Sequence, residues 1–182
     1  MMKMFFAFIA AAFLAVPAAM AAQTAAAPSQ MAKLNFLVGM WQGHGWIMTG
    51  PGQRHTFKET ETVTPKLDGD ALLIEGLGKS TDADNAGKTI HRALAIASYD
   101  ARTKAFRWYA LQAGGSPVDT QARVAHNTLI WHMTIPNGKL RFTIKLNDKK
   151  QWHEVGQFSR DGKTWYPFFE MMLSPLNPAG TK

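Results

Sequence analysis

The sequence predicts an all-β protein, in which about ten antiparallel strands close into an up-and-down barrel of the calycin or lipocalin type. Short segments of alternating apolar and polar residues follow one another between Gly39 and Leu173. Turn-forming residues separate them at intervals that suit strands of about 8–12 residues. No long crossover connection is evident, and closure of such a meander removes its unpaired edges. A two-sheet sandwich is the alternative.

The first 22 residues have the pattern of a secretory signal peptide. A lysine precedes the apolar run Met4–Val16, and small residues follow that run. We place the cleavage site after Ala22, with Ala21 as the near alternative. A membrane anchor is the other interpretation, but the run is short and Pro17 interrupts it. The sequence therefore predicts a periplasmic or secreted protein.

One short helix is expected between this segment and the strands. Residues 23–32 are rich in alanine and contain Pro28, so we expect a flexible leader followed by a single barrel domain over residues 33–182. Ser29–Leu37 is the only segment with helical spacing, and its apolar residues on one side are Met31, Leu34 and Leu37.

The strands are predicted by alternation and by the turns between them. The first half contains three such segments, Thr56–Thr64, Leu72–Lys79 and Ile90–Tyr99. In the second half, Asn137-Gly138 predicts a hairpin turn, because both central positions favour positive φ. The residues that this hairpin is expected to point inward are Leu129, Trp131, Met133, Leu140, Phe142, Ile144 and Leu146. Asp161-Gly162 joins the last two strands in the same way.

The start of the first strand carries a family resemblance. The segment Gly39-Met40-Trp41, within residues 36–45, resembles the opening of calycin-type barrels. More narrowly, it resembles the DUF1579 family and the nitrobindin-like haem-binding barrels. Three later segments fit the same kind of protein: Phe57–Val63, His91–Asp100 and Trp152–Leu173. The resemblance implies a lipocalin-like cavity with the indole of Trp41 closing one end, and it implies no particular reaction.

Candidate ligand-binding residues follow from the side-chain parity of the strands. Three faces combine polar with apolar side chains: Phe57, Glu59, Glu61 and Val63; Leu73, Glu75 and Leu77; and His91, Ala93, Ala95, Ala97 and Tyr99. Carboxyl groups on inward faces would have raised pKa values and could bind the polar part of a ligand. The alternative is that the three glutamates face water and pair with Lys58, Lys66 or Arg92. With the aromatic residues Trp41, Trp131 and Phe142, the candidates are Trp41, Glu59, Glu61, Glu75, His91, Tyr99, Trp131 and Phe142.

No cofactor is expected, but haem is an alternative. The six histidines lack zinc-site spacing, and no cysteine is available as a ligand. The nitrobindin-like resemblance implies an axial histidine late in the chain, for which His153 is the candidate, while His91 is a second candidate inside the barrel. The competing interpretation of His153 is a strand histidine hydrogen-bonded to a neighbour.

Composition excludes several function classes. The absence of cysteine excludes disulfides and thiolate chemistry, and no Gly-x-Ser-x-Gly motif occurs, so no catalytic residue is assigned. The net charge of +7 includes a basic stripe of Lys139, Arg141, Lys145, Lys149 and Lys150. We expect no nucleic-acid partner and no stable membrane insertion. The leading hypothesis is an exported barrel that binds a small, largely apolar molecule. The alternatives are a haem-binding barrel and an envelope protein with a filled barrel that is weakly attracted to anionic surfaces.

Overall fold

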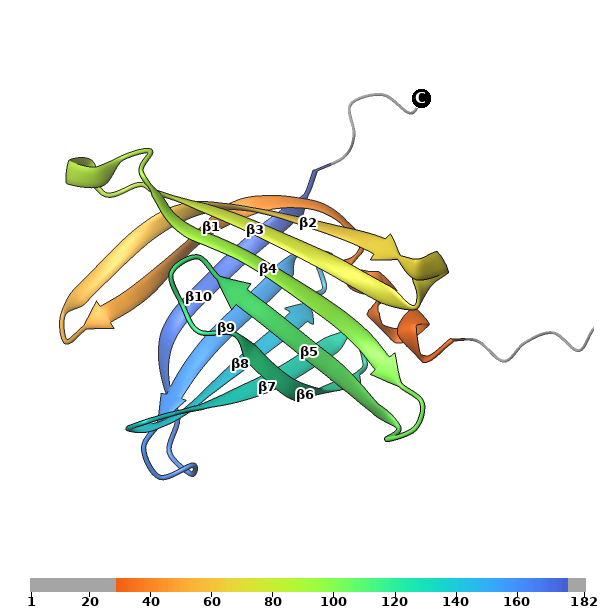
Figure 1. Ribbon diagram of the computed structural model, residues 1–182. Coiled ribbons are helices and arrows are strands. Elements are labelled where there is room, and N and C mark those ends of the chain that lie inside the picture. Colours follow the sequence, from red (N-terminus) through yellow and green to blue (C-terminus); the bar gives the residue numbers. More distant parts are fainter. Residues whose placement is uncertain (1–28, 177–182) are drawn as a thin grey trace, which may run out of the picture.

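The computed structural model describes residues 29–176, which form a closed barrel of ten antiparallel strands (Figure 1). Each strand pairs with its neighbours in the sequence, and β1 pairs with β10 to close the wall. This confirms the predicted fold class. The predicted signal peptide, residues 1–22, lies outside the described residues.

The strands have nearly the predicted positions. Their bounds are β1 Gly39–Gly50, β2 Gln53–Lys66, β3 Ala71–Ser80, β4 Thr89–Asp100, β5 Ala105–Gln112, β6 Val118–Ala125, β7 Thr128–Ile135, β8 Gly138–Leu146, β9 Trp152–Ser159 and β10 Tyr166–Pro175. Three short 3-10 helices accompany them: η1 Gln30–Leu37, η2 Leu67–Gly69 and η3 Ala83–Asn85. None of the helices within residues 29–176 is long and apolar enough to cross a membrane.

Helix η1 closes one end of the barrel. The Ser29 hydroxyl accepts a hydrogen bond from the Met31 backbone N–H at 3.2 Å, and the three apolar residues that the sequence places on one side of this helix are all buried. Trp41 continues the closure, because its indole N–H donates to the Leu37 carbonyl at 2.8 Å. The predicted leader therefore ends earlier than expected, since residues 30–32 belong to this packed helix.

The inner face of the wall follows the predicted alternation on most strands. The apolar row of the hairpin formed by β7 and β8 faces the interior, where Leu129 and Ile144 are almost completely buried. On β2, Phe57, Glu59, Glu61 and Val63 also point inward.

Strand β3 differs from the expectation. Leu72 and Ile74 point inward, whereas Glu75 and Leu77 are exposed on the outer face. The candidate Glu75 therefore does not point inward and faces outward instead, as the water-facing alternative predicts.

The wall is not paired along its whole height. β6 and β7 pair only next to their connecting turn, where residues 122–125 oppose residues 128–131. Beyond Ala122 the two strands pair with β5 and β8 on their other sides, and they diverge from each other (Figure 1).

Candidate ligand-binding site

The interior holds a cavity of about 490 Å³ with largely apolar walls. Two tryptophans and a phenylalanine form a stack along one wall, with ring centroids 5.7 Å apart for Trp108 and Trp131 and 4.2 Å apart for Trp131 and Phe142. Small residues of β4 and β5, among them Ala93 and Ala110, line another part. The volume is within the range of small-molecule sites, about 300–1,000 Å³.

Four cavity-lining side chains carry a buried polar atom without a hydrogen-bond partner among the described residues. These atoms are Nε1 of Trp108, Nε1 of Trp131, Nε2 of His91 and Oε2 of Glu61. An unsatisfied buried polar group costs about 1–3 kcal/mol. The wall of the cavity therefore contains two indole N–H groups and two further polar atoms that the described residues leave without a partner.

Three carboxyl groups gather on the inner wall. Glu59, Glu61 and Glu154 are 1 %, 7 % and 8 % exposed. Glu61 and Glu154 line the cavity, and the Trp152 indole N–H donates to Glu154 Oε2 at 3.1 Å. The alternation of side chains along β2 predicts the first two, whereas Glu154 is not among the candidates from the sequence. Its signal was present, because Glu154 is two residues after the buried Trp152 and therefore on the same face of β9.

Glycines on β3 make room for two of these carboxyl groups. Gly76 and Gly78 point inward opposite β2, and a methyl group built on Gly76 would lie 2.6 Å from Glu61 Oε1. A methyl group on Gly78 would collide with Glu59 Oε2. The inner face of β3 therefore lacks side chains where β2 carries its two glutamates.

Burial keeps Glu59 and Glu61 largely protonated at neutral pH. Desolvation, together with the nearby Glu154, raises the pKa of Glu59 to about 8. Desolvation and then the charges of Glu59 and Glu154 raise the pKa of Glu61 well above its usual value. Glu154 has a pKa raised to about 7 by burial. Burial also lowers the pKa of His91, so its imidazole is neutral. The site can therefore donate and accept hydrogen bonds without a full charge.

The remaining predicted site residues lie in three places. Trp41 packs edge-on against Trp152 at the closed end, with ring centroids 5.8 Å apart. Tyr99 packs in the same manner against Phe106, at 5.1 Å. Neither lines the cavity. Glu75 is on the outer face.

His153 also points away from the cavity. Its neighbours Trp152 and Glu154 point inward, while its Nε2 lies 2.8 Å from Glu170 Oε1 on the half-exposed outer side. This placement matches the interpretation of a strand histidine bonded to a neighbour, and it removes His153 from the interior haem site for which it was a candidate. Within residues 29–176, no group of three or more histidine and carboxylate side chains could hold a metal ion.

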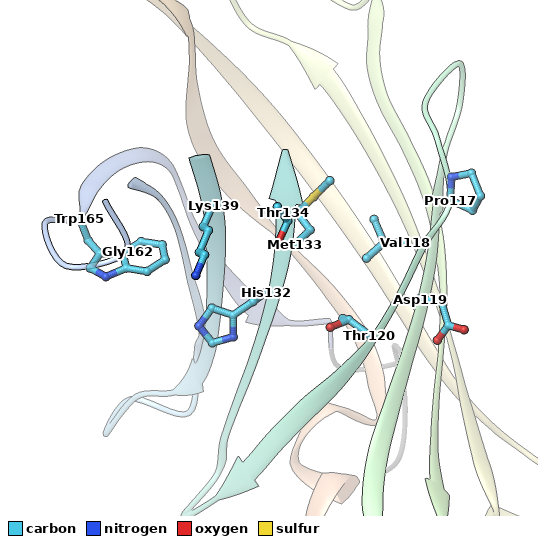
Figure 2. Close-up of a pocket in the computed structure, with 10 residues that line it drawn as sticks. All are labelled: Pro117, Val118, Asp119, Thr120, His132, Met133, Thr134, Lys139, Gly162 and Trp165. Atoms are coloured by element: carbon cyan, nitrogen blue, oxygen red, sulfur yellow. The ribbon is translucent and has the colours of Figure 1, made fainter. Parts of the chain in front are cut away.

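A second hollow lies on the outside of the wall, where β6 and β7 diverge (Figure 2). This outer cleft has a volume of about 580 Å³ and is lined by residues 117–120, residues 132–134, Lys139, Gly162 and Trp165. The Arg141 guanidinium lies over the Trp165 ring, 4.2 Å from its centroid.

Comparison with known proteins finds similarity at the level of the fold. No protein family and no curated protein sequence matches the chain. The crystal structure of Rv2717c from M. tuberculosis is similar, with a TM-score of 0.59, 12 % identity, and coverage of 81 % of this chain and 97 % of that chain. An S-type phycobiliprotein lyase, CPES from Guillardia theta, has a TM-score of 0.54, 9 % identity, and coverage of 80 % and 91 %. These two similarities show the barrel fold alone, and the resemblance to DUF1579 proteins stays a prediction.

Proposed function

We propose that the barrel binds a small, largely apolar molecule that carries at least one hydrogen-bonding group. The observation on which this rests is the interior cavity, whose aromatic and aliphatic walls contain the four polar atoms without partners. An apolar ligand gains free energy by leaving water, and a polar group on it would satisfy the indole N–H groups of Trp108 and Trp131.

The neutral state of the inner polar groups supports this kind of ligand. A buried ion would require a countercharge, whereas protonated carboxyl groups and a neutral imidazole suit an alcohol, a carbonyl or an amide. Glu61 and His91 both line this cavity, and each has a buried polar atom without a partner among residues 29–176.

Filling the cavity tests the proposal. In Ala93→Phe the added ring enters the cavity, whereas in Ile96→Phe it lies on the outer face of the same strand. We expect dodecanol, measured by titration calorimetry, to bind the wild-type chain and Ile96→Phe but not Ala93→Phe. Absence of binding to the wild type, or equal binding to both variants, would contradict the proposal. Far-ultraviolet circular dichroism checks that each variant is folded.

Haem is a second candidate occupant, and His91 is the residue that favours it. Its Nε2 is buried, borders the cavity and has no partner among residues 29–176, and a neutral imidazole is the form that ligates iron. Bound haem would supply a ligand-binding iron at the end of this side chain. If the chain binds haem, added hemin gives a Soret band that His91→Ala abolishes and His153→Ala preserves. A band that survives in His91→Ala would exclude this assignment.

We further propose that the chain is exported, on the basis of the signal-peptide pattern in residues 1–22. N-terminal sequencing of the protein from a periplasmic or culture-medium fraction should begin at Gln23 or Ala22. A chain that retains Met1 in the cytoplasm would contradict export.

A further inference from the structure

The wall of the barrel has a lateral gap between β6 and β7. Pairing between these strands ends at Ala122 and Trp131. Residues 118–121 of β6 pair only with β5, and residues 132–135 of β7 pair only with β8. Elsewhere, the neighbouring strands pair over most of their length. The ladder of hydrogen bonds between strands is therefore interrupted between residues 118–121 of β6 and residues 132–135 of β7.

The outer cleft occupies this gap and adjoins the interior cavity. Val118 and Met133 line both hollows. Figure 2 shows Met133 on β7 pointing toward Val118 on β6, so these two side chains lie where the outer cleft meets the interior cavity. Both are apolar, and methionine is flexible enough to change rotamer. A rotamer change of these two side chains would open a narrow apolar passage between the outer cleft and the cavity.

The outer side of this passage is positively charged. Lys139 lines the cleft. Desolvation lowers the pKa of His132, and the positive charges of Arg141, Arg123 and Lys139 lower it further. The acidic residue that lines the cleft, Asp119, forms an ion pair with Arg107. Three cationic side chains, Arg123, Lys139 and Arg141, thus act on His132, and none of them forms an ion pair with a carboxylate within residues 29–176.

Asp161, in the turn beside the outer cleft, is also held by hydrogen bonds. Its carboxylate accepts hydrogen bonds from the Ser159 hydroxyl and from the backbone N–H groups of Lys163 and Thr164, at 2.8–3.0 Å. It anchors the turn that contributes Gly162 and Trp165 to the cleft. The cleft therefore offers cationic side chains and one aromatic ring, above an apolar entrance.

We propose that the ligand is an amphipathic molecule with one anionic group, whose apolar part passes between β6 and β7 into the cavity while the anionic group stays in the outer cleft beside Lys139. This inference rests on the proposed function, because the apolar part needs the interior cavity. The gap supplies the route, and the charge of the cleft supplies the selectivity.

A comparison of lauric acid with dodecanol tests the inference, because the two differ only in the charged end. Lys139→Glu reverses the charge at the cleft, and Lys145→Glu makes the same change near the other end of β8. We expect the wild type to bind laurate at least about fivefold more tightly than dodecanol, as an attraction of about 1 kcal/mol between partly solvated charges implies. Lys139→Glu should lose this preference, and Lys145→Glu should keep it.

Dodecanol separates the two proposals. If dodecanol binds and Ala93→Phe abolishes its binding, the interior site stands. If, in addition, laurate binds no more tightly than dodecanol, or the two lysine variants behave alike, the outer cleft does not recognise the anionic group. If neither molecule binds the wild type, the proposed function itself fails. Unchanged dodecanol affinity in Lys139→Glu also shows that the variant is folded.

Discussion

Glu61 and Gly76 form a complementary pair on neighbouring strands. Glu61 extends its carboxyl group into the space where Gly76 has no side chain, and Glu59 does the same at Gly78. Inward glycines weaken a strand because they contribute no packing of their own. Here the lost packing is replaced by buried carboxyl groups, which a purely structural core would not favour. The arrangement is therefore better explained by a binding role than by stability.

The pairing of Gly76 with Glu61 predicts a specific non-additivity. Gly76→Ala should lower the free energy of unfolding by about 1 kcal/mol, the low end of overpacking effects, because the flexible Glu61 carboxyl can move. In the Glu61→Ala background the same substitution should be nearly neutral. Urea unfolding of the four chains measures this. Gly115→Ala is the control, since its methyl group would have only ordinary contacts at 3.4 Å or more. Strict additivity would contradict the pairing.

The protonated carboxyl groups predict that stability falls with rising pH. The folded pKa of Glu59 is about 8 against an ordinary value of 4.5, so the folded state holds a proton that the unfolded chain releases. The associated stability is fully present below pH 4.5 and is lost as the pH rises through about 8. Glu61 and Glu154 act in the same direction.

The clearest window lies between pH 6.5 and about 8. His91 has a lowered pKa and acts in the opposite direction, but only below 6.5, and Asp161, with a pKa of about 2, is ionised throughout. We expect Glu59 alone to lower the free energy of unfolding in urea by about 1–2 kcal/mol across this window, and Glu61 and Glu154 to add to the fall. Glu59→Gln should show a shallower fall, and the exposed Glu75→Gln should match the wild type. A flat pH profile would show that the glutamates are ionised.

The alternation of side chains along a strand predicts correctly which glutamates of β2 point inward, but not where the single glutamate of β3 points. Glu59 and Glu61 were placed correctly because Phe57 and Val63 flank them on the same face. Glu75 was placed wrongly because Leu73 and Leu77 made the outer face look apolar, while the inner face carried two glycines. Hydrophobic patterning cannot identify an inward face that consists of glycines. The side chains that fill the space beside these glycines, Glu59 and Glu61, belong to the neighbouring strand β2.

At the scale of elements, η1 and the first strand together act as the cover of one barrel end. Trp41 joins them, because its ring packs on Trp152 and its indole N–H donates a hydrogen bond to the carbonyl of Leu37, the last residue of the helix. This combination explains why a short 3-10 helix, with few internal hydrogen bonds, is ordered against the barrel: tertiary packing stabilises it.

Substitution of Trp41 separates packing from hydrogen bonding. Trp41→Phe should reduce the free energy of unfolding by about 1 kcal/mol beyond the loss of volume, since the Leu37 carbonyl loses its donor. Trp41→Ala should cost about 3–5 kcal/mol. The neighbouring Met40→Ala, at a side chain that is 55 % exposed, should be nearly neutral. Similar values for the three variants in urea unfolding would show that the cover is dispensable.

The gap between β6 and β7 could not have been predicted at this scale. Both strands alternate as regular strands, and the turn at His126-Asn127 predicts an ordinary hairpin. Where pairing stops depends on the curvature that closure imposes on the whole wall and on the length of the neighbouring loops. These are properties of the closed barrel, and no local pattern records them.

At the scale of the whole molecule, closure of ten strands leaves an interior that the side chains of residues 29–176 do not fill. Alternation, turn residues and the absence of long connections were sufficient to predict this architecture, because each depends only on neighbouring strands. The cavity required the structure, since its volume depends on how side chains from all sides meet. The filled-barrel alternative from the sequence is not favoured by a cavity of about 490 Å³.

The central claim is that this cavity is the binding site, and a crystal structure of the chain soaked with bromododecanoic acid tests it most directly. Anomalous scattering locates the bromine without reference to any assumed pose. We expect a bromine peak inside the barrel, beside Trp108 and Trp131. A peak found only on the outer surface of the barrel, with the interior unchanged, would contradict it.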